Sequence, residues 1–534
     1  MGQLKYLDCY AAVGKWTGKD IEAPWTIEQM LSDMERCRIH GALVYSHLSR
    51  ELQPSVGNQL VLEICDRNPR LFPCWVVLPH YCHEAPPGPK LVQAMLENGV
   101  RAAKLFPHLH RFSLKDPDLE LLLHSLEEAG LPAIFDRGEH ELEAQQIDWE
   151  EIPWLCTKFP RLNVILHGVR WEATRYLVPL MKRFPHLYCE FSNHQGNRII
   201  EFLVQEIGAE QLLFGTQMMQ KSPGAAKAFL DYANISDADR KKIAHENLAR
   251  LLKLEQLPAD YPEDLSTDKI LLRVRAAEPI DDMEVIDCHA HISEKGHSDI
   301  VIAPMPEADA AGLVDRNKRI GVDIACVSSW TGIWNDYERG NEIVFQAIQD
   351  FPNQIIGYAT LDPNYVLHWD LEIKRCHQAY GMKGMKPYFP RNKVPYNDRR
   401  YEPWFNYGNQ HHLFALMHFS ENFVKEMEDL AGKYAEISFL LAHSGMSYET
   451  ARKHIALAKQ FSNIFLEITY TAVTNGVIEY MVREVGSERV LYGSDSVMRD
   501  PIPQFGWLAY ANITEAEKRN IFGNNMRRII NRCR

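Results

Sequence analysis

The stretch from Glu284 to His291 is a short apolar run that ends in two histidines spaced two residues apart. On a strand, alternate side chains share a face, so His289 and His291 would point the same way. Neutral imidazoles at that spacing can chelate one metal ion. The chain has 22 histidines, and a second such pair, at positions 108 and 110, shows that the spacing also arises by chance. The pair therefore indicates a metal site only if further ligands converge on it.

Further residues of the kinds that bind metals or carry charge follow other apolar runs in the second half of the chain. In a (β/α)₈ barrel, catalytic groups lie at the carboxyl ends of the strands. Each residue alone has an ordinary structural explanation, as a hydrogen-bonded histidine, a capping aspartate or a solvated lysine. Six of them at the strand ends of one barrel are better explained by a common site. The set is His289, His291, Lys386, His418, His443 and Asp495.

The elements that must position these residues are apolar runs that alternate with helical patterns. Residues 337–350 form one such helical pattern, with Ile343, Val344, Ala347 and Ile348 on one face. Eight strands in about 250 residues predict a (β/α)₈ barrel. A doubly wound sheet would give the same alternation, but the six strand-end residues favour a closed barrel. The expected strands are 285–288, 324–328, 355–360, 384–387, 413–417, 439–441, 464–468 and 490–492.

The chain also repeats itself at a nearly constant offset. Residues 229–236 match 507–514, and 207–217 match 485–495, in both cases 278 positions further on. Such regularity indicates tandem copies of one fold, with small drifts caused by loop length. We therefore expect an α/β protein made of two tandem (β/α)₈ TIM-barrel domains.

The boundary between the two copies is expected in a segment that is rich in proline and acidic residues at its start. Ser266, Thr267 or Asp268 could cap a short helix over 271–275, which we place between the domains. The predicted organisation is a first barrel at 1–255, a linker at 256–283 and a second, catalytic barrel at 284–534.

The motifs of the second half resemble the amidohydrolase superfamily. They are Asp-x-His-x-His at 287–291, His-Ser-Gly at 443–445 and Gly-Ser-Asp at 493–495. The closer match is the amidohydrolase-related branch, which includes the aminocarboxymuconate-semialdehyde decarboxylase type and metal-dependent hydrolases. Segments 335–342, 356–363 and 381–386 are typical of that branch. The resemblance covers nearly all of 284–534 and covers 1–255 at fold level only.

This resemblance implies a divalent metal held by His289, His291, His418 and Asp495. Three nitrogens and one oxygen suit Zn²⁺, and a water of lowered pKa would complete the shell. Asp495 would also accept a proton, and His443 would act as a general acid or base. Lys386 would neutralise an anionic group of the substrate. In binuclear relatives a carboxylated lysine bridges two metals, which would make Lys386 and His443 ligands; one ion is favoured here.

Three functions fit this site. The first is hydrolysis of an amide-like or lactone-like bond in a small, acidic substrate, and the second is non-oxidative decarboxylation of a small aromatic or unsaturated acid. The third, a non-catalytic binding protein, is disfavoured by the complete set of ligands. Trp330 and Arg391 are expected in substrate loops, together with Trp334, Tyr388 and Trp404, where they would suit a flat acid, although loop aromatics can equally serve packing.

The first copy has lost most of the site. The counterparts of His289, His291, His418 and Asp495 are Tyr10, Ala12, Asp136 and Gln217, whereas Lys104 and His167 match Lys386 and His443. The first barrel is therefore predicted to be a pseudo-enzyme domain. It could imitate the partner subunit of family homodimers, which would make the chain an intramolecular pseudo-dimer and a possible homo-oligomer. Candidates to reach the second site are Arg137, His140 and Arg170.

Composition narrows the partners to a small-molecule substrate. The net charge of −13 argues against a nucleic-acid surface. No apolar run approaches 18 residues, which argues against a membrane span. The start of the chain shows no signal-peptide core. Eleven cysteines without Cys-x-x-Cys spacing indicate reduced thiols and a cytoplasmic protein.

Overall fold

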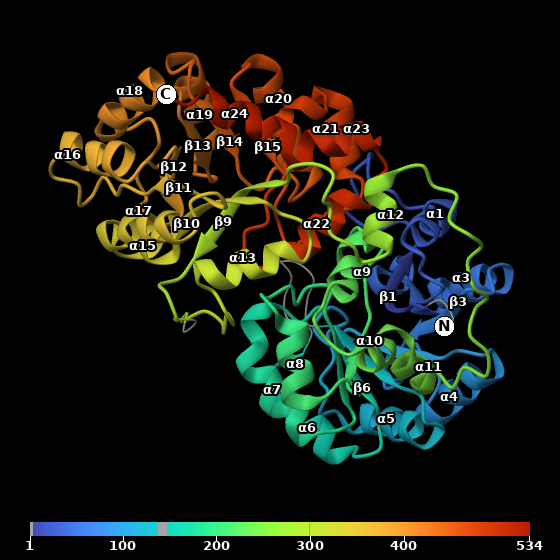
Figure 1. The fold of residues 1–534 in the computed structure, drawn as a ribbon. Helices are drawn as coiled ribbons and strands as arrows, with labels where there is room; N and C mark the ends of the chain where they lie inside the picture. Colours follow the sequence, from blue (N-terminus) through green and yellow to red (C-terminus); the bar gives the residue numbers. More distant parts are fainter. Residues whose placement is uncertain (1–3, 137–146, 298–299) are drawn as a thin grey trace. The chain divides into compact units, whose positions relative to one another are not determined.

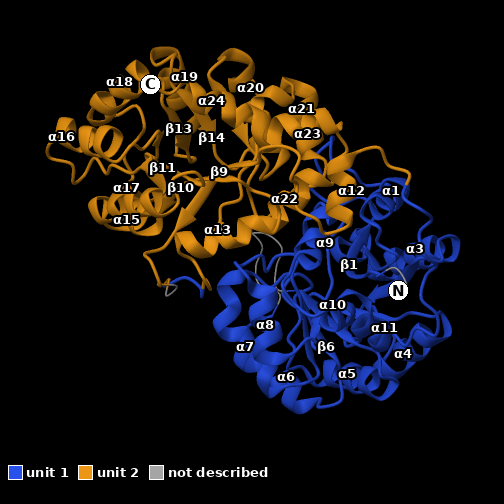
Figure 2. Cartoon of the chain, in the orientation of Figure 1, with its two compact units in different colours: residues 1–264, 301–304 blue, residues 265–300, 305–534 orange. Residues whose placement is uncertain are grey.

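Each strand of the protein pairs in parallel with the strand that follows it in sequence, in two separate sets of eight. The computed structural model describes residues 4–136, 147–297 and 300–534. The chain divides into unit 1, residues 1–264 with 301–304, and unit 2, residues 265–300 with 305–534 (Figures 1 and 2). Helices alternate with the strands in each unit. The prediction of two tandem (β/α)₈ barrels is confirmed.

The strands of unit 2 fall at all eight predicted places, with bounds shifted by a few residues. The predicted helix over 337–350 is present as α15, Tyr337–Asp350. The strands are β9 Ile286–Ile292, β10 Ile324–Ser329, β11 Ile355–Ala359, β12 Gly384–Met385, β13 Phe414–Met417, β14 Ser438–Leu441, β15 Ile464–Glu467 and β16 Val490–Leu491.

The segment after β16 returns to β9 and closes the barrel of unit 2. The amide of Cys288 donates to the carbonyl of Tyr492 at 3.0 Å, and the amide of Asp495 donates to the carbonyl of His289 at 2.7 Å. An isolated parallel bridge joins Ala290 to Ser496. These bonds bring the end of β16 beside β9, so Asp495 lies next to the two histidines of that strand.

The interior of this barrel is packed with side chains from alternate strand positions. The hydroxyl of Tyr358 donates to the carbonyl of Cys288 at 2.6 Å inside this core. Helix α24, Asn525–Arg532, packs Met526, Ile529 and Ile530 against the cluster that contains Ile286 and Ile324, which begin β9 and β10. One end of the barrel is thereby filled with apolar groups, and the polar residues lie at the opposite, carboxyl ends of the strands.

Helix α12, Lys269–Arg275, lies within the predicted linker and begins after Asp268, whose carboxylate accepts from the amide of Leu271 at 3.0 Å. It packs against other helices of unit 2 and buries Ile270 and Val274, so it belongs to that unit and not to a free connection between domains. The other α-helices of unit 2 are α13 Ala310–Lys318, α14 Trp330–Trp334, α16 Trp369–Ile373, α17 Phe389–Asn392, α18 Glu402–Gln410, α19 Phe423–Lys433, α20 Tyr448–Gln460, α21 Val477–Val485, α22 Pro501–Ala509 and α23 Glu515–Arg519.

Unit 1 repeats the same architecture. Its barrel closes through the amide of Cys9, which donates to Phe214, and the amide of Gln217, which donates to Tyr10, at 2.9 and 2.8 Å. Among the described residues of both units, no helix is long and apolar enough to cross a membrane. The strands are β1 Leu7–Val13, β2 Gly41–Ser46, β3 Leu71–Val76, β4 Ala102–Leu105, β5 Ala133–Asp136, β6 Val164–His167, β7 Leu187–Glu190 and β8 Leu212–Leu213. The α-helices are α1 Ile27–Cys37, α2 His47–Glu51, α3 Pro54–Arg67, α4 Gly88–Glu97, α5 Pro117–Ala129, α6 Glu151–Lys158, α7 Thr174–Arg183, α8 Ile199–Ile207, α9 Pro223–Asp231, α10 Asp237–Lys241 and α11 Asn247–Leu251.

Candidate metal centre

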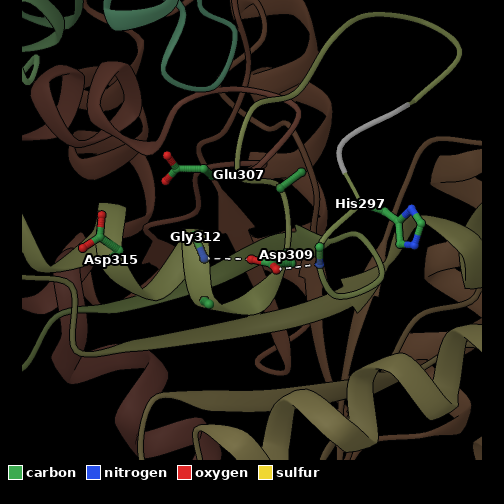
Figure 3. Close-up of a pocket in the computed structure, with 8 residues that line it drawn as sticks. His297, Glu307, Asp309, Gly312 and Asp315 are labelled. Atoms are coloured by element: carbon green, nitrogen blue, oxygen red, sulfur yellow. Dashed lines mark hydrogen bonds between the residues drawn. The ribbon is translucent and has the colours of Figure 1, made fainter.

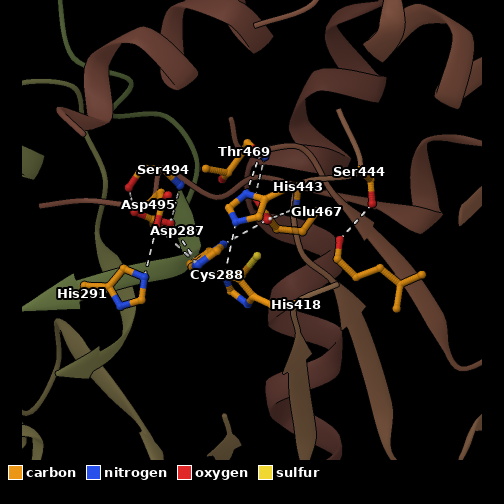
Figure 4. A network of polar contacts seen from close by, with 12 residues as sticks. Asp287, Cys288, His291, His418, His443, Ser444, Glu467, Thr469, Ser494 and Asp495 are labelled. Atoms are coloured by element: carbon orange, nitrogen blue, oxygen red, sulfur yellow. Dashed lines mark hydrogen bonds and ion pairs between the residues drawn. The ribbon is translucent and has the colours of Figure 1, made fainter. Parts of the chain in front are cut away.

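The carboxyl ends of the strands of unit 2 bring the predicted ligands together in one buried cluster (Figure 4). His289 and His291 project from β9, and their Nε2 atoms lie 3.6 and 3.1 Å from Oδ1 of Asp495. His418 follows β13, and its Nε2 lies 3.2 Å from Nε2 of His443, which follows β14. All five side chains are buried.

The cluster contains two groups of three ligand atoms, each within 4.8 Å of one another. One group is His289, His291 and Asp495, and the other is His289, His418 and His443. His289 belongs to both groups, so the four predicted ligands surround one region. His443 lies among them, although the sequence assigned it a role beside the metal. This geometry is compatible with His443 as an acid or base and also with His443 as a ligand.

Lys386 follows β12 and lies within this cluster. Its Nζ is 3.3 Å from Nε2 of His289, and its side chain is fully buried. Burial lowers the pKa of Lys386 well below its usual value. The predicted role of neutralising a substrate anion needs an ammonium, and this surrounding disfavours the charged form.

Burial also lowers the pKa of His289, His291, His418 and His443 well below the usual histidine value. The rings are therefore neutral near pH 7, which is the form that binds metals. Nδ1 of His418 is buried without a hydrogen-bond partner among the described residues. A cluster of neutral imidazoles with one carboxylate, including a buried nitrogen without a partner, fits a divalent cation.

Glu467, which ends β15, orients two of these histidines and was not identified from the sequence. Its Oε2 accepts from the backbone amide of His443 at 3.0 Å and lies 3.0 Å from Nδ1 of His289. Its Oε1 accepts from the amide of Thr469 at 2.6 Å. Because the carboxylate is the acceptor, His289 carries its proton on Nδ1 and turns the lone pair of Nε2 toward the cluster.

We expect Glu467→Gln to weaken metal binding by about 10–100-fold, the usual cost of removing a partner that orients a ligand. The glutamine amide has only one oxygen that can accept, and its NH₂ group must face an N–H donor on the other side, so it holds Nδ1–H of His289 less firmly and no longer fixes that tautomer. Titration of the metal-free protein with Zn²⁺ measures the effect. Glu190→Gln in unit 1, at the matching position, is the control and should leave Zn²⁺ affinity unchanged.

Two other contacts orient the rings of His443 and His291. Nδ1 of His443 donates to the carbonyl of Thr469 at 2.9 Å, which places the lone pair on Nε2, the atom that lies 3.2 Å from Nε2 of His418. Nδ1 of His291 lies 3.0 Å from the hydroxyl of Ser328. His443 and Asp495 both adopt left-handed backbone angles, with φ of 62° and 60°. This conformation is uncommon for residues other than glycine and occurs often at functional sites.

The aspartate of the Asp-x-His-x-His motif holds the backbone. Oδ1 of Asp287 accepts from the amides of His289 and Ser494, both at 3.0 Å, and Oδ2 accepts from the hydroxyl of Ser494. Burial raises the pKa of Asp287 to about 7. Asp287 therefore ties the end of β9 to the segment after β16 that carries Asp495.

Arg499 is a second residue that the sequence did not reveal. Its guanidinium pairs with Oδ2 of Asp495 and donates to the hydroxyl of Thr471, and the side chain is buried. Oδ1 of Asp495 is the oxygen that faces the histidines. Arg499 lies four residues after Asp495, beyond the end of the expected strand. The rule that functional residues follow strand ends therefore did not identify it.

The residues expected in substrate loops are divided between the site and the core. The ring of Trp330 lies 4.5 Å from that of His291, and the ring of Tyr388 lies 4.9 Å from that of His418. Arg391 lies over Trp334, 3.4 Å from the ring centre, and Trp334 in turn lies 6.0 Å from Trp330. Trp404 is fully buried in α18 and donates to Nε2 of His377 at 2.8 Å, so it is a core residue and not part of a substrate loop.

A separate pocket lies in the loops between β9 and α13 (Figure 3). Asp309 is the N-cap of α13, and its carboxylate accepts from the amides of Gly312 and Gly296, both at 2.9 Å. This carboxylate is therefore used to hold the loop. The pocket contains none of the clustered ligands; it is lined by Gly296, His297, Glu307, Ala308, Asp309, Ala311, Gly312 and Asp315.

In unit 1 the matching place is filled by a buried ion pair. Nζ of Lys104 lies 3.0 Å from Oδ2 of Asp136 and 3.2 Å from Nδ1 of His167. The hydroxyl of Tyr10 donates to the same carboxylate oxygen at 2.7 Å, and its ring stacks on His167 with centres 4.2 Å apart. Lys104 thus supplies a positive charge where unit 2 gathers metal ligands.

The backbone scaffold of the site is nevertheless retained in unit 1. Oδ1 of Asp8 accepts from the amides of Tyr10 and Thr216 at 2.8 and 3.0 Å, as Asp287 does in unit 2. Glu190 accepts from the amide of Gly168 at 2.9 Å. Gln217 keeps the left-handed backbone of its counterpart Asp495, with φ of 58°.

Three residues of the first barrel were expected as candidates to reach the second site. Arg137 and His140 lie outside the described residues. Arg170 pairs with Glu172 at 3.0 Å within unit 1. A further group in unit 1, His108 with Asp148 and Glu151, is exposed or half-buried, and exposed acidic groups of this kind are common without a metal.

The fold defines the class of protein, which is an α/β protein of two tandem (β/α)₈ barrels, and one of the barrels gathers imidazoles and a carboxylate at its strand ends. A model of the amidohydrolase family matches residues 24–254 and again 286–532, and the chain belongs to that family. The duplication seen in the sequence thus corresponds to two copies of one family domain.

Comparison with curated protein sequences found no match. Among solved structures, a putative amidohydrolase from Staphylococcus aureus is 16% identical, covers 47% of this chain and 100% of its own, and gives a TM-score of 0.39. A 2,6-dihydroxybenzoate decarboxylase is 16% identical, covers 48% and 100%, and gives 0.39. A 4-oxalomesaconate hydratase from Rhodopseudomonas palustris is 18% identical, covers 46% and 96%, and gives 0.36.

Proposed function

We propose that the second barrel is a metal-dependent hydrolase that acts on an amide-type or lactone-type bond, C–N or C–O, of a small, acidic substrate. The observation that carries the proposal is the convergence of His289 and His291 on Oδ1 of Asp495, with His418 and His443 completing the cluster. The family assignment supports metal-dependent chemistry at this end of the barrel.

The ligands of one divalent ion would be His289, His291, His418 and Asp495. Three nitrogens and one oxygen favour Zn²⁺ among the common ions. When bound, such an ion supplies Lewis acidity and a water of lowered pKa. The place of His443 within the cluster and the buried amine of Lys386 support the competing arrangement with two ions, and metal analysis distinguishes the two.

The protein's own residues would move protons in the reaction. Arg499 engages Oδ2 of Asp495 and leaves Oδ1 directed at the histidines, where it can accept a proton. The carbonyl of Thr469 holds Nδ1–H of His443, so Nε2 is the atom that takes up or delivers a proton at the substrate. Trp330 and Tyr388 provide flat surfaces beside the histidines.

The aromatic surroundings also favour a second candidate, the non-oxidative decarboxylation of a small aromatic or unsaturated acid with the same ligands. The rings of Trp330, Tyr388 and Tyr470 lie within 4.5–5.4 Å of rings in the histidine cluster. Such walls suit a planar substrate. Arg391, which lies over Trp334 and so beside Trp330, would be a cation to attract the carboxylate of such a substrate.

One experiment separates these functions. The metal content of the purified protein is measured, and the loaded protein is then assayed with lactones, amides and aromatic acids while CO₂ is detected. Hydrolysis without CO₂ supports the first candidate, and release of CO₂ supports the second. Stoichiometric metal with no turnover of any member of the panel would favour a non-catalytic binding protein.

We also propose, from the duplication alone, that the two barrels form an intramolecular pseudo-dimer, like the homodimers of the family. The fragment to test is 265–534, which keeps α12 and its buried residues with unit 2. Expressed alone, 265–534 is expected to be poorly soluble or strongly reduced in activity, since an apolar face would be uncovered. A soluble and fully active fragment would disprove the pseudo-dimer.

A further inference from the structure

Phe419 directly follows His418, the proposed ligand after β13, and it lies at the border between the metal centre and solvent. His418 is 4% exposed, whereas Phe419 is 49% exposed. Single exposed apolar residues are common on protein surfaces, so exposure alone indicates no function. Phe419 differs from such residues because its ring lies 6.3 Å from the ring of His443. One aromatic side chain thus reaches from the solvent to the proposed acid or base.

The pairing of two neighbouring strands places Phe419 beside His443. Strands β13 and β14 run in parallel with their last residues opposite each other, and the amide of Ala442 donates to the carbonyl of Met417 at 2.9 Å. Because the two strands end together, Phe419 leaves the sheet two residues after β13 at the level where His443 leaves it two residues after β14. The barrel itself therefore brings the Phe419 ring to the cluster.

The rings around the cluster differ in how far they reach toward solvent. Between ring centres, Trp330, Tyr388 and Tyr470 lie 4.5, 4.9 and 5.4 Å from histidines of the cluster. Trp330 is buried and both tyrosines are half-buried, so Phe419 is the exposed member of the four. A small molecule at the cluster can therefore pack on the exposed part of this ring without displacing a side chain of the barrel. Removal of apolar surface from water favours such a contact.

We propose that Phe419 is a specificity-determining residue of the second barrel, which packs against a flat apolar group of the substrate, such as a phenyl ring. The inference rests on the proposed function, because the metal ligands and His443 define where the substrate reacts. Aromatic pairs add to the free energy of burial when the rings stack with an offset or meet edge to face. The preferred substrates are therefore aryl acids, or aryl amides and lactones, in place of small acids without a ring.

The test uses the full-length protein loaded with Co²⁺, whose visible absorption changes when a further ligand binds, so no substrate needs to be known. Two probes bind metal through the same hydroxamate group: acetohydroxamic acid carries a methyl group, and benzohydroxamic acid carries a phenyl ring. We expect the wild-type protein to bind benzohydroxamate roughly tenfold more tightly than acetohydroxamate. Phe419→Ala should reduce this preference by about 3–10-fold and leave the affinity for acetohydroxamate unchanged.

Two further variants serve as controls. Phe419→Tyr keeps the ring, and its hydroxyl can face solvent, so the preference for the phenyl probe should be retained. Leu121→Ala removes an apolar side chain of similar exposure, 43%, from α5 of unit 1 and should change neither affinity. Hydrogen exchange of the wild-type protein needs no variant. Benzohydroxamate should protect the amides of residues 419–422 from exchange more strongly than acetohydroxamate does.

The inference is overturned if the two probes bind equally, if Phe419→Ala weakens both to the same extent, or if Leu121→Ala has the same effect as Phe419→Ala. In each of these cases the metal centre still binds the probes, so the proposed function is untouched. If neither hydroxamate alters the Co²⁺ spectrum, the proposed function is wrong and this inference is wrong with it. Circular dichroism checks the folding of each variant, and the exchange result decides if one misfolds.

Discussion

Replacing His443 with asparagine is expected to lower the turnover of the metal-loaded protein by about 10²–10⁴-fold, the range for loss of a general acid or base. Asparagine can still donate to the carbonyl of Thr469, but it has no Nε2 lone pair to exchange a proton. Metal content should remain nearly intact if one ion is held by the four proposed ligands, which do not include His443. Turnover and metal content are measured on the same preparation.

The matched comparison is His291→Ala, which removes a predicted ligand on β9 and should lose the metal. If His443→Asn loses metal as completely as His291→Ala does, His443 is a ligand and the two-ion arrangement with Lys386 replaces the one proposed here. If neither variant changes turnover, the cluster is not the catalytic site.

Replacing Lys104 with methionine is expected to destabilise unit 1 by about 3–5 kcal/mol, because it leaves the Asp136 carboxylate buried without its cation. Burial alone would raise the pKa of Asp136, but the charge of Lys104 holds it at about 2, below the usual 3.8. The stabilisation of unit 1 by the Lys104–Asp136 ion pair is therefore present above about pH 4 and is lost as the pH falls through 2. Hydrogen exchange of the amides in β4–β6 measures the loss of stability in unit 1.

The control for this substitution is Lys386→Met at the matching position of unit 2. In unit 2 the residue that matches Asp136 is His418, which has no carboxylate to be left without its cation. The loss of stability in unit 2 should therefore be smaller than the loss in unit 1. Lys104→Met combined with Asp136→Leu should recover part of the stability, since both charges are then absent. A loss as large in the double variant as in the single one would show that packing, and not charge, makes the pair important.

The eight strands of unit 2 could be predicted because buried parallel strands leave short apolar runs, and the histidines could be predicted because strand ends converge in a barrel. Glu467 could not be identified in this way. It ends β15 as a single acidic residue after an apolar run, and only the fold shows that one oxygen reaches both His289 and the amide of His443. Arg499 was missed for another reason, since its position relative to Asp495 depends on a loop.

The surroundings of Lys386 could not be predicted from its residue type. A lysine at a strand end predicts a cation for the substrate, and the structure adds that the amine is fully buried beside His289. Trp404 was expected in a substrate loop, but it lies on the buried face of α18. Burial depends on tertiary packing, which the residue types do not record.

The scaffold that the two units share separates the holding of the backbone from the binding of ligands. Asp8, Glu190 and the left-handed backbone of Gln217 hold the strand ends of unit 1, where the residues that match the predicted ligands of unit 2 are different. The residues at the ligand positions can therefore differ between the two copies while both barrels keep the same fold. A duplicated barrel of this kind leaves one copy free to vary at its ligand positions, because the backbone scaffold does not depend on them.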